Sequence, residues 1–220
     1  MNRKFAEGIT FKKLLWVFLI GSIFGAYYEE ILYTTTHIIE YGTFAWSPRR
    51  GVLWGPLSPI YGIGAVLMTA VLVNKKDKLY ITFFKAAALG GILEYLVSLF
   101  QEMFLGTVAW DYSEKILNLS GRTTIPYMLF WGFLGVLFIK MVYPAMEKVI
   151  ESIPPIEGEK WTRVLLVIVI LDIGISWSAI IRQSFRHYGI KQYTVIDRWY
   201  DEHFNDEYLN AHFPNTIVKK

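Results

Sequence analysis

The sequence contains no cysteine, and this absence excludes several chemistries at once. Without thiols the chain cannot form disulfides, thiolate-bound metal centres or a cysteine nucleophile. Histidine is scarce as well, and no two histidines are four residues apart on one helical face; they are His37, His187, His203 and His212. We therefore expect no metal site and no cofactor.

Two motifs of nucleotide-binding proteins and hydrolases are also missing. The sequence has no Gly-x-x-x-x-Gly-Lys-Ser/Thr loop for ATP and no Gly-x-Ser-x-Gly nucleophile elbow. A net charge of +3 is too small to indicate nucleic acid as a partner. We assign no catalytic residue, and we expect a protein that is not an enzyme more than one that is.

Charge is sparse overall. Only 19% of the residues are charged and 54% are hydrophobic, whereas a soluble domain has about a quarter charged residues. The apolar residues form five blocks, at about 14–32, 52–73, 81–105, 123–143 and 163–181. Each approaches or exceeds the ~20 residues that cross a bilayer as a helix. The sequence therefore predicts an all-α, polytopic membrane protein with about five transmembrane helices.

The blocks suggest one transmembrane domain over residues 1–186, followed by a polar C-terminal tail over 187–220. The second block should begin irregularly, because two prolines and three glycines fall in Gly51–Gly62. Such a broken or re-entrant segment is tolerated at membrane depth only where it packs against protein or lines a wet cavity.

The distribution of basic residues predicts the orientation. The segment before the first block carries four, and the loop after the second block carries Lys75, Lys76 and Lys78; the four are Arg3, Lys4, Lys12 and Lys13. Positive charge accumulates on the cytoplasmic side. We expect a multi-pass protein of the cell membrane with a cytoplasmic N-terminus. Five spans place the chain from about Arg182 onward outside, although the six basic residues of that segment oppose this, so the side of the tail stays open.

Polar residues inside the spans indicate sites where helices meet or ligands bind. In the third block, Glu94 shares a helical stripe with small and polar residues: Ala87, Gly91, Ser98 and Gln101. In the first block, Gly21 and Gly25 share a face with Glu29, which makes Glu29 a better candidate than Glu30. Asp172 begins a similar stripe in the fifth block. Interhelical hydrogen bonds are the structural alternative for each carboxylate.

The loop from Trp110 to Arg122 concentrates aromatic and hydrogen-bonding groups at the outer membrane boundary. We expect three arginines to face three carboxylates across this rim, namely Arg49, Arg50 and Arg122 against Glu29, Glu102 and Asp111. The rim is either a set of structural ion pairs or an outward cavity that holds a headgroup or an anion. The candidates for binding or transport are Glu29, Arg50, Tyr61, Glu94, Ser98, Glu102, Trp110, Asp111, Tyr112, Asn118, Arg122 and Asp172.

Residues 145–153 are predicted to form an amphipathic helix at the cytoplasmic surface. Ala145, Met146, Val149, Ile150 and Ile153 recur at helical spacing, and Pro154-Pro155 ends the helix. Such a helix can lie on lipid or dock a partner protein.

Several of these motifs together resemble one known family. They are Gly21-Ser22-x-x-Gly25 with Glu29, Arg50-Gly51-x-x-x-Gly55-Pro56-x-x-Pro59-Ile60-Tyr61-Gly62, Glu94-Tyr95-x-x-Ser98 with Glu102, and Trp110-Asp111-Tyr112-Ser113 to Gly121-Arg122. Their order is similar to that of the CmpB-type family of ABC-transporter permeases. The resemblance implies a bacterial multi-span transport protein, and it supplies no catalytic residue.

Three functions remain open at this point. A permease component would need a separate ATPase subunit, which residues 145–153 could dock, and a homo-oligomer to enclose a path with so few spans. A membrane-embedded enzyme acting on lipid or envelope precursors would use Glu94, Glu102 or Asp111 as acid or base and Arg50 or Arg122 to hold phosphate. A membrane sensor or scaffold would need neither.

Overall fold

A computed structural model of the chain describes residues 4–46, 48–73 and 76–218, and it is almost entirely helical. Arg3 and Lys75, two of the residues used to predict the orientation, lie outside the described residues. The first six helices are α1 (Phe11–Tyr41), α2 (Pro59–Leu72), α3 (Leu79–Phe100), α4 (Ile125–Leu137), α5 (Tyr143–Glu151) and α6 (Pro155–His187). Two short helices follow, α7 (Val195–His203) and α8 (Asp206–His212). The predicted all-α class is confirmed.

Two π-helical turns extend these helices. The turn η1 (Gln101–Leu105) continues α3, and η2 (Phe138–Val142) joins α4 to α5 without a break. Within the described ranges, four helices are long and apolar enough to cross a membrane: Phe11–Tyr41, Leu79–Leu105, Ile125–Glu151 and Pro155–His187. The segment predicted as a separate surface helix, 145–153, is therefore largely the end of a continuous membrane helix.

The second predicted span is a shorter helix with an irregular approach. The helix α2 has 14 residues, and Pro59 stands in its first turn, where a missing N–H costs nothing. The backbone before it bonds to neighbouring helices: Leu53 N–H donates to the Ser176 hydroxyl at 2.8 Å, and Ser58 N–H donates to the Ser22 carbonyl at 3.1 Å. The broken start of the second block thus packs against protein, as predicted.

Small residues bring two pairs of helices into close contact. A Cβ on Gly21 would lie 2.8 Å from the Ala65 Cβ, so α1 and α2 meet at the predicted glycine face. A Cβ on Gly90 would lie 2.2 Å from the Trp131 Cγ, and this contact joins α3 to α4. The glycines allow large side chains of the partner helix to approach the backbone.

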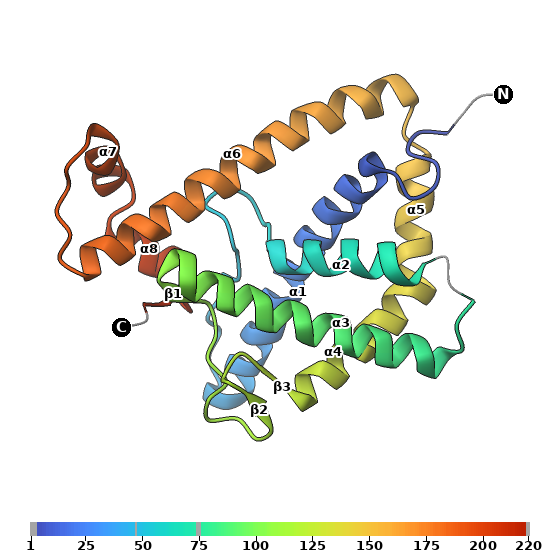
Figure 1. Ribbon diagram of the computed structural model, residues 1–220, viewed down its shortest axis with the longest axis horizontal. Helices are drawn as coiled ribbons and strands as arrows, with labels where there is room; N and C mark the ends of the chain where they lie inside the picture. The colour runs from blue at the N-terminus through green and yellow to red at the C-terminus, as the bar shows by residue number, and fades with distance from the viewer. Residues whose placement is uncertain (1–3, 47, 74–75, 219–220) are drawn as a thin grey trace.

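The two chain ends lie at opposite ends of the molecule (Figure 1). The N-terminal end gathers residues 4–10, α5 and the start of α6 around a core that includes Phe5, Met146 and Ile150. The far end gathers the segments 42–46 and 48–58, the loop 106–124 and the tail up to residue 218. The helix α6 runs between the two ends, and several apolar side chains in its middle are exposed, as on a surface that faces lipid.

Short strands fasten the far end. Strand β1 (Thr107–Val108) pairs antiparallel with β4 (Ile217–Val218), so that Thr107 faces Val218. Strand β2 (Asn118–Leu119) pairs with β3 (Thr123–Thr124) in a hairpin directly before α4. The tail is therefore joined to the end of α3, and the hairpin is fixed beside the start of α4.

Candidate functional site

The centre of the candidate site is Glu94 on α3. Its stripe neighbours Ala87, Gly91 and Ser98 are buried, and Glu94 itself is 7% exposed. Its carboxylate accepts a hydrogen bond from the Tyr112 hydroxyl at 3.2 Å and one from the Thr123 hydroxyl at 2.6 Å. Both donors come from the loop between α3 and α4, so the loop closes over the buried acid.

The loop is shaped by bonds within itself. The Trp110 indole N–H donates to the Arg122 carbonyl at 2.8 Å, and the Tyr112 N–H donates to the Gly121 carbonyl at 2.8 Å. Gly121 has a φ of 67°, and a Cβ there would lie 2.5 Å from the Ser113 hydroxyl. A residue with a side chain would be strained at this position. This conformation aims Tyr112 and Thr123 at α3.

Two further residues of the loop stabilise its turn. The Asn118 amide donates to the carbonyls of Ser113 and Lys115 and accepts from the Gly121 N–H. The Asp111 carboxylate accepts from the Ser113 hydroxyl at 2.5 Å and from the Ser113 N–H at 2.9 Å. These contacts of Asp111 and Asn118 support the loop.

Tyr112 remains a hydrogen-bond donor over the physiological pH range. Burial raises the pKa of its phenol well above the usual value, and the neighbouring Glu94 raises the pKa further. Deprotonation would place a second negative charge beside the carboxylate. The hydroxyl therefore keeps its proton and directs it at Glu94.

A second carboxylate lies on the neighbouring pair of helices. Glu29 on α1 accepts a hydrogen bond from the Tyr61 hydroxyl of α2 at 3.0 Å. The Tyr61 ring packs where Gly25 leaves room, with its centroid 5.8 Å from that of Trp131.

Trp131 also covers Gly90, one turn from Glu94, so its ring packs both against Tyr61, the partner of Glu29, and against the helix that carries Glu94. We call this group the carboxylate cluster, and its members are Glu29, Tyr61, Glu94, Tyr112, Thr123 and Trp131.

Glu30 contacts the backbone of Arg49 and the side chain of Arg50. Its side chain is buried, its carboxylate accepts from the Arg49 N–H at 3.4 Å, and the Arg50 Nε lies 3.7 Å away. The Arg49 guanidinium stacks on the Tyr33 ring, 3.5 Å from its centroid. Arg50 is therefore paired with Glu30 instead of the predicted Glu29, since a 100° rotation along the helix turns Glu30 toward the segment.

The third arginine of the predicted rim pairs with Glu102. The Arg122 guanidinium lies 2.5 Å from the Glu102 carboxylate and donates to the Ser98 hydroxyl at 3.3 Å. Arg122, Ser98 and Glu102 thus form one group at the end of α3, immediately beside Thr123 of the cluster.

Asp172 lies in a different place from these groups. It accepts from the Trp54 N–H at 3.2 Å and from the Ser176 hydroxyl at 3.1 Å. Ser176 in turn accepts from the Leu53 N–H. The contacts of Asp172 hold the irregular backbone before α2 against α6, which satisfies N–H groups that lipid could not.

Sequence reasoning missed Thr123, Trp131 and the role of Glu30. Thr123 follows the Gly121-Arg122 motif directly, but a threonine next to a predicted helix gives no signal of its own. Trp131 sits on an apolar helix where an aromatic residue is expected to face lipid or core. Within residues 4–46, 48–73 and 76–218, no three acidic or histidine side chains gather as metal ligands would.

Comparison with known proteins gives one match. The family model described as "Putative ABC-transporter type IV" matches residues 16–177, which include most of α1, the whole of α2 to α5, most of α6 and the whole carboxylate cluster. No curated protein and no solved structure matches the chain.

Proposed function

Because the chain belongs to the putative ABC-transporter type IV family, we propose that it is the membrane-spanning permease component of such a transporter. The observation that carries this proposal is that acids from two candidate membrane-spanning helices, Glu29 and Glu94, accept hydrogen bonds from hydroxyl groups. A path for a polar solute needs polar groups inside the bilayer that can change partners. Hydroxyl–carboxylate bonds meet that need better than tight buried ion pairs.

We further propose that the cluster and the loop above it line a polar cavity that opens outward. The candidate residues remain those predicted from the sequence: Glu29, Arg50, Tyr61, Glu94, Ser98, Glu102, Trp110, Asp111, Tyr112, Asn118, Arg122 and Asp172. The core of the proposal is two hydrogen-bonded pairs, Glu29 with Tyr61 and Glu94 with Tyr112. Asp172 would act only by holding the approach to α2.

A substitution at Glu94 tests the permease proposal. The measurement is the rate of ATP hydrolysis that the membrane component stimulates in a complex purified with its ATPase. Glu94→Gln should lower this rate by about tenfold, which corresponds to the loss of one hydrogen bond to a charged group, ~1.4 kcal/mol. The exposed Glu114→Gln in the same loop is the matched control and should leave it unchanged. If Glu94→Gln instead lowers the melting temperature and leaves hydrolysis intact, Glu94 is structural and the cavity proposal is wrong.

The ATPase would be a separate chain that docks near α5. The apolar residues Met146 and Ile150 of the predicted docking helix are buried within the protein. The surface left for a partner is therefore the other side of α5 and the tip that follows it, where Val149 is 60% exposed and Ile156 is 83% exposed. We propose this surface as the site of docking.

Charge reversal on this surface tests the docking. Cross-linking in native membranes followed by purification should recover a nucleotide-binding protein with the wild-type chain. A double substitution, Lys148→Glu with Val149→Asp, should reduce recovery at least about tenfold, since a charge buried at an interface costs several kcal/mol. Lys115→Glu at the far end is the control. Equal recovery from both variants would refute docking at α5.

The proposed setting is the bacterial cell membrane, with the N-terminus cytoplasmic and the tail outside. The division into a membrane domain over residues 1–186 and a tail over 187–220 belongs to the same proposal. Among the described residues, a single chain has four candidate spans and the shorter apolar helix α2. These are few helices to enclose a path, so we propose a homo-oligomer. A measured protein mass that corresponds to one chain per nanodisc would contradict the homo-oligomer.

An enzyme acting on lipid or envelope precursors is the less favoured alternative. It would require Arg122 to hold a phosphate, and that guanidinium already bonds to Glu102 and Ser98. The family match, rather than these contacts, favours the permease.

A further inference from the structure

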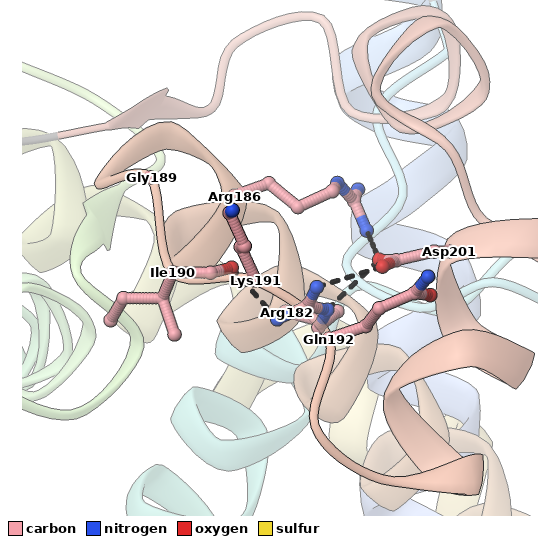
Figure 2. Close-up of a pocket in the computed structure, with 7 residues that line it drawn as sticks. All are labelled: Arg182, Arg186, Gly189, Ile190, Lys191, Gln192 and Asp201. Carbon is pink, nitrogen blue, oxygen red and sulfur yellow. Dashed lines mark hydrogen bonds and ion pairs between the residues drawn. The ribbon is translucent and has the colours of Figure 1, made fainter.

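A shallow cavity of about 530 Å³, largely open to the surface, lies at the end of α6, in the angle between that helix and the tail. In Figure 2 the guanidinium groups of Arg182 and Arg186 converge on the carboxylate of Asp201, which comes from α7. The turn 189–192 forms the opposite wall. These residues are separate from the carboxylate cluster, and all of them lie beyond the segment that the family model matches.

The wall of this cavity is held in place by the backbone. Gly189 has a φ of 73° and its N–H donates to the Arg186 carbonyl at 2.9 Å, while the Ile190 N–H donates to the Phe185 carbonyl at 2.9 Å. The Ile190 carbonyl accepts from Arg182 at 3.3 Å. This turn reverses the chain and returns Lys191 to the side of the two arginines.

The lining carries more positive than negative charge. Asp201 is bound by the Arg182 Nη2 at 2.7 Å and by the Arg186 Nη1 at 2.6 Å. The hydrogen bond from Arg182 is the main cause of its lowered pKa, so Asp201 stays ionised. Asp206 pairs with Arg186 from outside the cavity. Among the residues that the structure describes, no carboxylate forms an ion pair with the exposed Lys191, so one positive charge remains.

Arg182 is built into the cavity as a fixed donor. It is 5% exposed, and its Nε, Nη1 and Nη2 atoms each make one hydrogen bond within the protein. Each Nη atom of a guanidinium carries a second N–H. A planar fork of N–H groups beside a lysine ammonium is suited to the oxygens of a phosphate.

The depth of the cavity matches the headgroup layer of a bilayer. The 33 residues of α6 extend ~50 Å at ~1.5 Å per residue, well beyond ~30 Å of hydrocarbon. From Val164 to Ile181 the only charged residue is Asp172, so Arg182 is the first residue after the apolar run. Exposed aromatic side chains surround this end of the helix, as is typical at a membrane surface; they are Phe185, Tyr188, Tyr193 and Trp199.

We propose that this cavity, the α6–tail pocket, binds a phosphate group at the membrane surface. The ligand is either the headgroup of an anionic phospholipid or a free phosphate-bearing solute, and the recognition chemistry is the same for both. Arg182 provides the fixed fork, and Lys191 provides the charge that no protein carboxylate neutralises.

The experiment uses the full chain in nanodiscs and measures the melting temperature. One arm compares phosphatidylcholine with a mixture of phosphatidylcholine and phosphatidylglycerol. The other arm titrates inorganic phosphate into phosphatidylcholine nanodiscs, with sodium chloride at matched ionic strength. Lys191→Gln should weaken the stabilising effect about fivefold in apparent affinity, as expected for one partly exposed charge contact. Lys115→Gln, an equal charge change at the same end of the molecule, should have no effect.

The two arms separate the sources of the phosphate. Stabilisation by phosphatidylglycerol that depends on Lys191 supports a lipid headgroup, and stabilisation by inorganic phosphate that depends on Lys191 supports a solute. The proposal is overturned if Lys191→Gln and Lys115→Gln behave alike with both probes. Arg182→Lys keeps the charge but loses the fork, and it should weaken the same response; should it fail to fold, the exposed Lys191→Gln still decides the outcome.

Discussion

Glu94 and Glu29 each accept a hydrogen bond from a tyrosine hydroxyl, and each of those tyrosines comes from another element. The expense of a carboxylate in an apolar helix makes Glu94 conspicuous in the sequence. Its donors Tyr112 and Thr123 lie 18 and 29 residues away along the chain. Helical periodicity relates only residues about three or four positions apart on one face. It could therefore rank the acids as candidates, but it could not identify the residues that donate hydrogen bonds to them.

A glycine substitution tests the contact that positions Tyr61. In Gly25→Ala, the new Cβ would lie 2.1 Å from the Tyr61 Cγ, so α1 and α2 must separate or Tyr61 must move away from Glu29. We expect a loss of about 1–3 kcal/mol in stability, as for other overpacked cores. The measurement is the melting temperature in detergent. Gly174→Ala on α6, where nothing lies within 4 Å, is the control and should be neutral or slightly stabilising; an equal loss there would refute the argument.

Among the elements, α5 differs most from expectation. The amphipathic pattern of residues 145–153 was interpreted as a surface helix, but Met146 and Ile150 pack against Phe5 and α1. Lys13, fully buried, approaches Glu151 at 2.8 Å and Glu147 at 3.2 Å. An amphipathic pattern indicates that a helix has an apolar face. It does not indicate whether lipid, a partner protein or another part of the same chain covers that face.

Removal of the buried lysine tests this attachment. Lys13→Met should cost about 3 kcal/mol, the lower end of the range for breaking a buried pair, because Glu151 keeps some contact with solvent. Lys12→Met removes the half-exposed pair with Glu159 and should cost less than about 1 kcal/mol. Thermal or denaturant unfolding of both variants gives the comparison. Equal losses of stability in the two variants would mean that the buried ion pairs of Lys13 stabilise the protein no more than the half-exposed pair of Lys12.

At the scale of the whole molecule, the described segments divide between two ends. Residues 4–10, α5 and the start of α6 lie together, while the loop 106–124 and the tail lie at the far end. The tail is fastened there by the β1–β4 pairing and by the Arg182–Asp201 ion pair. The mixed charges of the tail do not decide on which side of the membrane it lies. The contacts of the tail in the structure place it at the same end of the molecule as the loop 106–124.

Because the chain contains no cysteine, single introduced cysteines can test the orientation directly. We expect Lys115→Cys and Lys191→Cys to react with a membrane-impermeant maleimide in intact cells. Lys148→Cys should react only after permeabilisation. All three positions are exposed, so accessibility differs only by side. Labelling of Lys148→Cys alone in intact cells would invert the proposed topology.

The sequence by itself determined the class of this protein, its membrane helices, the irregular approach to α2 and the family, because hydropathy, prolines and glycines act locally on the chain. Only the tertiary structure decided that Arg50 pairs with Glu30 and not with Glu29, that Asp172 holds the backbone before α2, and that Thr123 binds Glu94. Partners of a buried polar group are set by how helices rotate and pack, and that rotation depends on contacts distant in sequence.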